Sequence, residues 1–229
     1  MAAFKNNYLE EKISILYFLI AFFEIVAELF IYKPLIYYLK PILPITLMVL
    51  YWTISDKRQL FFFLSLFFSF LTNIFFIPNS QEMLFYGIIA FTFHRILAII
   101  LVFKLTKIKD FIPFIIATLP FLLIFFYLFM ETNDIPENSF LILILQNLLI
   151  SVFAGIALSC YVMNDNKQNS ILLITALLFV MLHFVVYIEK YFLTNEYGTL
   201  FRPIAMTFHV LAFYSYYKYV IIAEKSNND

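Results

Sequence analysis

Two glutamates, Glu24 and Glu28, lie four residues apart inside a long apolar stretch of the sequence. This spacing places both side chains on one face of a helix, one turn apart. Two carboxylates this close in a low-dielectric environment cannot both be charged cheaply, so we expect one of them to be protonated. The pair could act as an acid and a base or could bind a cation. Glu28 is also near the end of the stretch, where it could pair with Lys33 or Lys40 instead.

His94 and Arg95 lie in the middle of another apolar stretch. An ionisable residue inside a membrane span is a candidate functional residue because burying it is costly. His94 could donate a proton or orient a substrate phosphate, and it could equally form a hydrogen bond to a neighbouring helix. The planar guanidinium of Arg95 suits forked binding of a lipid phosphate, although a structural ion pair fits the position as well.

Two further histidines, His183 and His209, lie in two other apolar stretches. Histidine is a common metal ligand, but no His-x-x-x-His spacing occurs here, and we expect no metal site and no cofactor. Gln146 and Asn147 lie in another stretch, where we expect them to form hydrogen bonds between helices. The lone Cys160 cannot form a disulfide within the chain.

These residues belong to a chain of 229 residues that is 64% hydrophobic, with a mean hydropathy of +0.92. Only 13% of the residues are charged, which is too few to cover a solvated surface. The formal net charge is zero, so the chain lacks the basic surface that nucleic acid binding requires. The composition therefore predicts an integral membrane protein.

The apolar stretches predict an all-α bundle of about eight transmembrane helices in a single domain, residues 1–229. Each stretch is about 20 residues long, which matches the thickness of a bilayer. The stretches lack the alternation of polar and apolar residues that a barrel strand would show. The expected spans are residues 13–32, 36–54, 59–78, 82–103, 111–130, 139–162, 170–190 and 200–222.

The positions of the basic residues predict the orientation. Ten of the 15 lysines and arginines lie at the two termini and in the loops after the second, fourth and sixth spans, Lys107 and Lys109 among them. Basic residues collect on the cytoplasmic side of a membrane, so we expect both termini to be cytoplasmic. We expect the membrane to be the inner (plasma) membrane of a bacterium.

Four short motifs follow one another along the chain. They are Lys40-Pro41-Ile42, similar to a Lys-Pro-Leu element; residues 69–73, similar to Ser-x-x-Gly-Asp; Gly87 followed by residues 90–94 ending in His94; and residues 176–183, similar to Ala-Leu-Leu-Phe-x-x-Ser-Asp. In this order, over about residues 30–220 of an eight-span chain, they resemble the motifs of the YhhN family of lysoplasmalogenase-like membrane proteins.

The resemblance implies a hydrolase that cleaves the vinyl ether bond of lysoplasmalogens in the membrane. Such a reaction needs an acid to protonate the alkenyl carbon and a negative group to stabilise the resulting cation. The two aspartate positions of the family motifs hold Asn73 and His183 here. Asn73 can orient water but cannot transfer a proton. His183 could be the acid, because the reference pKa of histidine is about 6.5.

The first functional hypothesis is therefore a hydrolase with an altered site and a lysophospholipid-like substrate. His183, Asn73 and His94 are its candidate catalytic residues, and its candidate substrate-binding residues are Lys40, Arg95, Glu24 and Glu28. The second hypothesis is a non-catalytic lipid-binding or interaction protein on the same scaffold. A transporter is a third, but the sequence shows no paired half-repeats. The sequence makes no prediction of oligomeric state.

Overall fold

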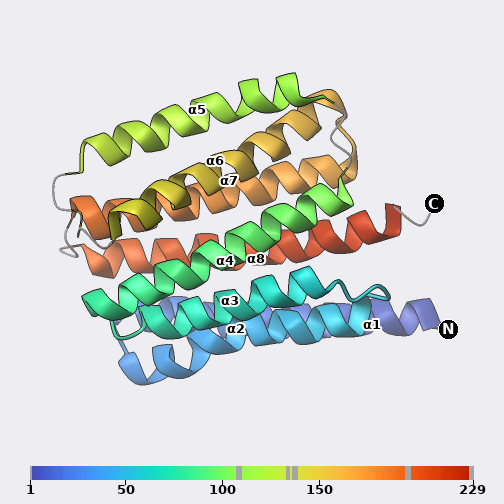
Figure 1. Ribbon diagram of the computed structural model, residues 1–229. Helices are drawn as coiled ribbons and strands as arrows, with labels where there is room; N and C mark the ends of the chain where they lie inside the picture. The colour runs from blue at the N-terminus through green and yellow to red at the C-terminus, as the bar shows by residue number, and fades with distance from the viewer. Residues whose placement is uncertain (1, 107–109, 133–134, 136–138, 194–196, 227–229) are drawn as a thin grey trace.

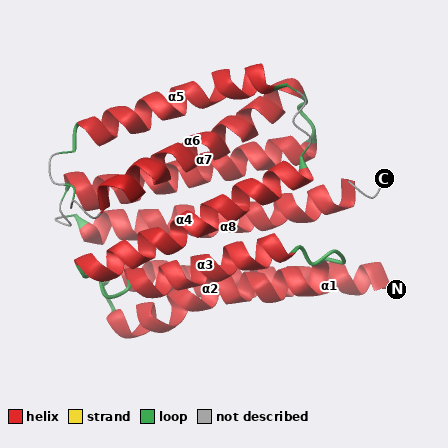
Figure 2. Ribbon diagram, in the orientation of Figure 1, coloured by secondary structure: helices red, strands yellow, loops and turns green. Residues whose placement is uncertain are grey.

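A computed structural model describes residues 2–106, 110–132, 135, 139–193 and 197–226, with side chains from residue 8 onward. This part of the chain forms eight α-helices and one short π-helix and contains no strand (Figure 2). The all-α class predicted from the sequence is thereby confirmed. Lys107 and Lys109, two of the loop residues used to predict the orientation, lie outside the described residues.

The eight α-helices occupy the eight expected ranges, with different ends. They are α1 (Ala2–Leu29), α2 (Lys33–Ile54), α3 (Leu60–Phe76), α4 (Gln81–Leu105), α5 (Phe111–Met130), α6 (Phe140–Met163), α7 (Lys167–Tyr187) and α8 (Gly198–Ser226), with the π-helix η2 (Ile188–Phe192) directly after α7. The largest differences are at the termini, where α1 begins at residue 2 instead of 13 and α8 continues to residue 226 instead of 222.

Within the described residues, five helical segments are long and apolar enough to cross a membrane: α2, α4, α5, α6 and the continuous segment formed by α7 and η2. Helix α3 is apolar but has 17 residues, about 26 Å at 1.5 Å per residue. Apolar helices satisfy their own backbone hydrogen bonds, which is what a lipid environment requires. The protein is therefore a membrane protein, and the face of the membrane on which its termini lie stays a prediction.

The helices run up and down in one elongated bundle (Figure 1). Helices α1, α2 and α3 form one side, α5 lies at the opposite side, and α4 and α8 pass between α3 and the α6–α7 pair. Both termini lie at one end of the bundle. The α1–α2 and α3–α4 connections, the last turn of α5 and the first turns of α6 and α8 lie at the other end, which we call the cavity end for the site described below.

The N-terminal extension of α1 is held against α8 at the terminal end. Glu10 accepts hydrogen bonds from Lys218 Nζ at 2.7 Å and from the Tyr217 hydroxyl at 3.1 Å. Nearby, the Tyr51 hydroxyl of α2 donates to Glu224 of α8. Glu10 and Glu224 lie beyond the apolar stretches from which the spans were predicted, and these contacts hold both carboxylates against neighbouring helices.

Helix α5 lies at the edge of the bundle and packs chiefly against α6. Gly155 of α6 makes this approach possible, because a Cβ atom at this position would lie 1.9 Å from Thr118 Oγ1 and 2.9 Å from the Thr118 backbone Cα. Gly87 of α4 differs, since a Cβ atom there would meet the ring of Phe76, the far end of a rotatable side chain.

This difference predicts that Gly155→Ala destabilises the protein more than Gly87→Ala. The alanine at 155 must push α5 away from α6, and overpacking of this kind costs about 1–3 kcal/mol. Thermal unfolding of both variants in detergent measures the effect, with Gly87→Ala as the matched control. Equal melting temperatures for the two variants would contradict the close α5–α6 packing.

Candidate functional site

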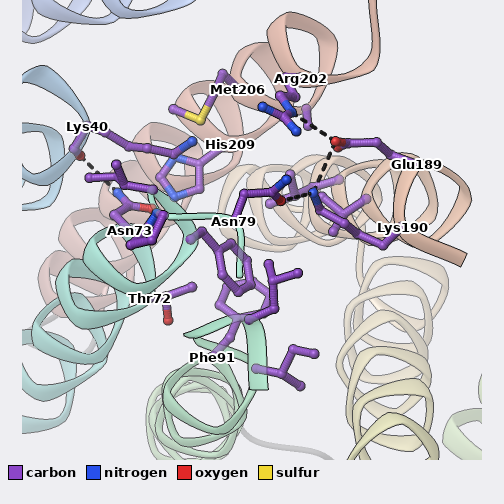
Figure 3. Close-up of a pocket in the computed structure, with 18 of the residues that line it drawn as sticks. Lys40, Thr72, Asn73, Asn79, Phe91, Glu189, Lys190, Arg202, Met206 and His209 are labelled. Atoms are coloured by element: carbon purple, nitrogen blue, oxygen red, sulfur yellow. Dashed lines mark hydrogen bonds and ion pairs between the residues drawn. The ribbon is translucent and has the colours of Figure 1, made fainter. Parts of the chain in front are cut away.

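A cavity of about 610 Å³ lies at the cavity end of the bundle. Its wall combines two kinds of side chain contributed by α1, α2, α3, α4, α6, α7, η2 and α8 (Figure 3). The apolar part includes Phe85, Ile88, Phe91, Leu143, Leu182 and Met206; the polar part includes Glu28, Lys33, Lys40, Asn73, Asn79, Gln146, His183, Glu189, Lys190, Arg202 and His209.

Asn73 is held in place by a backbone carbonyl of α2 that has no donor within its own helix. Pro44 lies inside α2 and has no N–H group, so the carbonyl of Lys40 four residues earlier lacks its usual helical partner. The Asn73 Nδ2 atom donates to this carbonyl at 2.9 Å. The amide is 3% exposed and lines the cavity. Asn73 therefore replaces the missing donor, and its Oδ1 atom is left to accept a hydrogen bond from a ligand or water.

The Lys40 side chain carries the charge next to this site. Its Nζ atom forms an ion pair with Glu28 Oε1 at 2.6 Å, and both residues line the cavity. This confirms the proximity of Glu28 and Lys40 that their sequence positions suggested. Glu24, one turn earlier, is fully buried behind the pair and is not among the lining residues.

His183 lines the cavity from α7 and is oriented by Asn147 of α6. The His183 Nε2 atom lies 2.8 Å from Asn147 Oδ1, and Asn147 Nδ2 is directed at the carbonyl of Phe125 at 3.3 Å. An amide oxygen only accepts hydrogen bonds, so Nε2 carries the proton of this bond. Nδ1 is therefore the His183 atom that can give or take a proton in the cavity.

His94 and Arg95 lie outside the cavity wall, which places them away from the headgroup position expected for them. Arg95 Nη1 donates to the Gln146 backbone oxygen at 3.0 Å and also to the Gln146 side-chain oxygen. His94 Nδ1 lies 2.9 Å from the Ser65 carbonyl, and its ring stacks on Phe91. Both residues thus join helices. For His94 this is the alternative that the sequence left open, whereas the described partner of Arg95 is the neutral Gln146 and not the opposite charge of an ion pair.

Several polar residues of the wall were not predicted as site residues. Glu189, Lys190 and Arg202 form a charged group at the cavity end, where the Glu189 carboxylate contacts both basic side chains (Figure 3). His209 of α8 lines the same cavity, and its Nδ1 atom has no hydrogen-bond partner in the described part of the chain. In the sequence, Lys190 and Arg202 are recognisable only as charges that mark the ends of spans.

The arrangement suits an amphiphilic ligand, because residues that could take part in proton transfer line the same cavity as the apolar and charged side chains. The apolar wall can take a hydrocarbon chain, the charged group can take a polar headgroup, and His183 and Asn73 lie on the wall of the same cavity. Within the described residues, no group of three or more His, Cys, Asp or Glu side chains is placed to hold a metal ion.

The structural role of Arg95 predicts that Gln146→Leu destabilises the protein. The variant removes the side-chain acceptor of a buried charge, a loss of about 1–3 kcal/mol, whereas the double variant Arg95→Met/Gln146→Leu removes both partners and should recover part of it. Unfolding of the double variant and of both single variants, Gln146→Leu and Arg95→Met, in detergent measures this coupling, with lipid-facing Leu148→Ala as the control. Additive losses would show that the pair is not coupled.

Comparison with known proteins places this fold and cavity in a family. No curated protein and no solved structure matches the chain. The model of the YhhN family matches residues 35–223, which cover most of the chain and include all the site residues above except Glu24, Glu28 and Lys33. The chain belongs to the YhhN family.

Proposed function

We propose that this chain is a membrane hydrolase that cleaves the vinyl ether bond of lysoplasmalogens to a fatty aldehyde and a glycerophospho-headgroup. The observation that carries the proposal is that one cavity combines an apolar wall, a charged end, and His183 and Asn73 at the two positions that resemble the acid positions of the family. A single-chain lipid has the same order of parts: a hydrocarbon chain, a reactive ether bond and a headgroup.

The chemistry proceeds in three steps. With both ring nitrogens of His183 protonated, transfer of the Nδ1 proton to the alkenyl carbon distal to the ether oxygen produces an oxocarbenium ion and leaves a neutral imidazole. Water adds to the carbon bonded to the ether oxygen, and the proton that water loses returns to the site. The resulting hemiacetal breaks its bond to the glycerol oxygen, giving the aldehyde and the free hydroxyl. One water molecule is consumed, and the protein is restored.

Other side chains support these steps. Asn73 Oδ1 is free to orient the attacking water, because Asn73 Nδ2 is held by the Lys40 carbonyl. The Glu28 carboxylate is kept in the cavity wall by its ion pair with Lys40 and can stabilise the positive oxocarbenium ion. His209 lies in the same wall and could accept the proton that water releases.

A non-catalytic lipid-binding protein is the second candidate, and the contact of Asn73 favours it. An amide donates to the Lys40 carbonyl as a protonated carboxylic acid would, but it has no proton to transfer. The substitution therefore preserves the helix contact while removing the chemistry, which is how a scaffold could persist for binding alone.

The first test is aldehyde release from a lysoplasmalogen by the purified protein in liposomes. We expect release by the unchanged protein and a loss of about 100-fold or more in His183→Ala, since general acid catalysis contributes about 10²–10⁴-fold. Met181→Ala, two residues away on α7 and facing outward, is the matched control. Full turnover by a folded His183→Ala variant would remove His183 from the mechanism.

The hydrogen bond from Asn73 to the Lys40 carbonyl also predicts the effect of Asn73→Asp. An aspartate can donate to this carbonyl only when it is protonated, so the variant should place a carboxylic acid in the cavity and increase aldehyde release. Asn73→Leu, which cannot donate, should lower the melting temperature without increasing activity. A folded Asn73→Asp variant and unchanged protein that both bind lipid without releasing aldehyde would favour the lipid-binding alternative.

A further inference from the structure

The charged group at the cavity end is built around one buried carboxylate. The Glu189 side chain is 4% exposed, and its Oε1 atom accepts from Lys190 Nζ at 3.1 Å and from Arg202 Nε at 3.0 Å. Lys190 Nζ also donates to Asn79 Oδ1 at 2.8 Å. The two basic side chains are thereby held in fixed positions beside the cavity (Figure 3).

The local backbone supports a binding role for this group. Glu189 and Lys190 lie in the π-helix η2 that continues α7, and π-helical turns are uncommon and frequently occur at functional sites. Asn79 has a left-handed backbone conformation, with φ of 54°, in the α3–α4 connection. Asn79, Glu189 and Lys190, the residues in these two segments, all line the cavity.

Among the described residues, the charges that line the cavity do not balance. The lining includes the carboxylates Glu28 and Glu189, each already in an ion pair, and the four basic residues Lys33, Lys40, Lys190 and Arg202. Arg202 uses Nε for Glu189, so both of its Nη atoms remain outside that bond, and the Arg202 side chain is 27% exposed. Such a group suits a forked contact with phosphate oxygens.

We propose that the cavity end is a phosphate site, formed by Arg202, Lys190 and Lys33, that selects lysophospholipids with a net negative headgroup over zwitterionic ones. The headgroup phosphate accepts from the basic side chains. A headgroup that carries an additional ammonium would bring a positive charge into a region where positive charge is already in excess. This inference rests on the proposed function in assigning a single-chain lipid to the cavity, but it does not require turnover.

The test is binding of two ester-linked lysolipids with the same acyl chain, lysophosphatidylglycerol and lysophosphatidylcholine. Neither contains a vinyl ether, so binding is measured apart from the proposed reaction. We expect lysophosphatidylglycerol to bind the full chain in neutral detergent about threefold to tenfold more tightly than lysophosphatidylcholine, as charge-assisted contacts imply. This preference should shrink when salt is raised from roughly 50 mM to roughly 0.5 M. Equal affinities at low salt would overturn the proposal.

Substitutions test which residues cause the preference for lysophosphatidylglycerol. Arg202→Gln and Lys190→Gln should reduce it about threefold or more, while Lys225→Gln, an exposed charge at the terminal end, should leave it unchanged. The first two variants leave the buried Glu189 with fewer partners and can unfold. Lys33→Gln changes an exposed residue of the rim and keeps the measurement informative. A preference that survives both Lys33→Gln and a folded Arg202→Gln variant would overturn the proposal.

A soluble ligand identifies the source of the phosphate. Glycerol phosphate offers the same anion without a hydrocarbon chain, so it should stabilise the protein far less than lysophosphatidylglycerol at equal concentration. Equal stabilisation by the two compounds would overturn the assignment to a lipid. Failure of aldehyde release with the binding preference intact would reject the proposed hydrolysis and leave this site standing.

Discussion

A proline inside a membrane helix creates the constraint on which the site depends. Pro44 removes one N–H donor from α2, and in a lipid environment the unpaired carbonyl of Lys40 must find a donor within the protein. Asn73 of α3 supplies it, while the Lys40 side chain pairs with Glu28 of α1. One residue of α2 therefore fixes three helices, and the polar atoms that it brings together form one side of the cavity.

On the other side of the cavity, too, buried polar groups form hydrogen bonds between helices. Gln146 of α6 accepts from Arg95 Nη1 and donates to Thr92, which joins α6 to α4. Nε and Nη2 of Arg95 have no hydrogen-bond partner in the described part of the chain. The next residue, Asn147, accepts from His183 and fixes which ring nitrogen faces the cavity. Buried polar networks of this kind are costly when incomplete, which ties the geometry of the candidate acid to the packing of α4, α6 and α7.

The sequence predicted the helices well because lipid leaves the backbone few alternatives, and apolar stretches about 20 residues long show where the helices lie. It could not predict which polar groups meet. Helix α4 is apolar on all sides, so its sequence does not reveal that Arg95 and His94 point away from the cavity. The spacing of Lys40 and Pro44 in the sequence does indicate a carbonyl in need of a donor, since a proline inside a helix leaves the carbonyl four residues earlier without its usual hydrogen bond. The π-helical turn that positions Glu189 has no comparable signature.

The positions of the two termini have a practical consequence. Both helix ends leave the bundle on the side away from the cavity, and α1 and α8 are joined there through Glu10 and Lys218. A fluorescent protein or an affinity tag fused to either terminus would therefore lie far from the cavity. Fusions at both termini together would report on the separation of α1 from α8 by energy transfer, without touching any residue that lines the cavity.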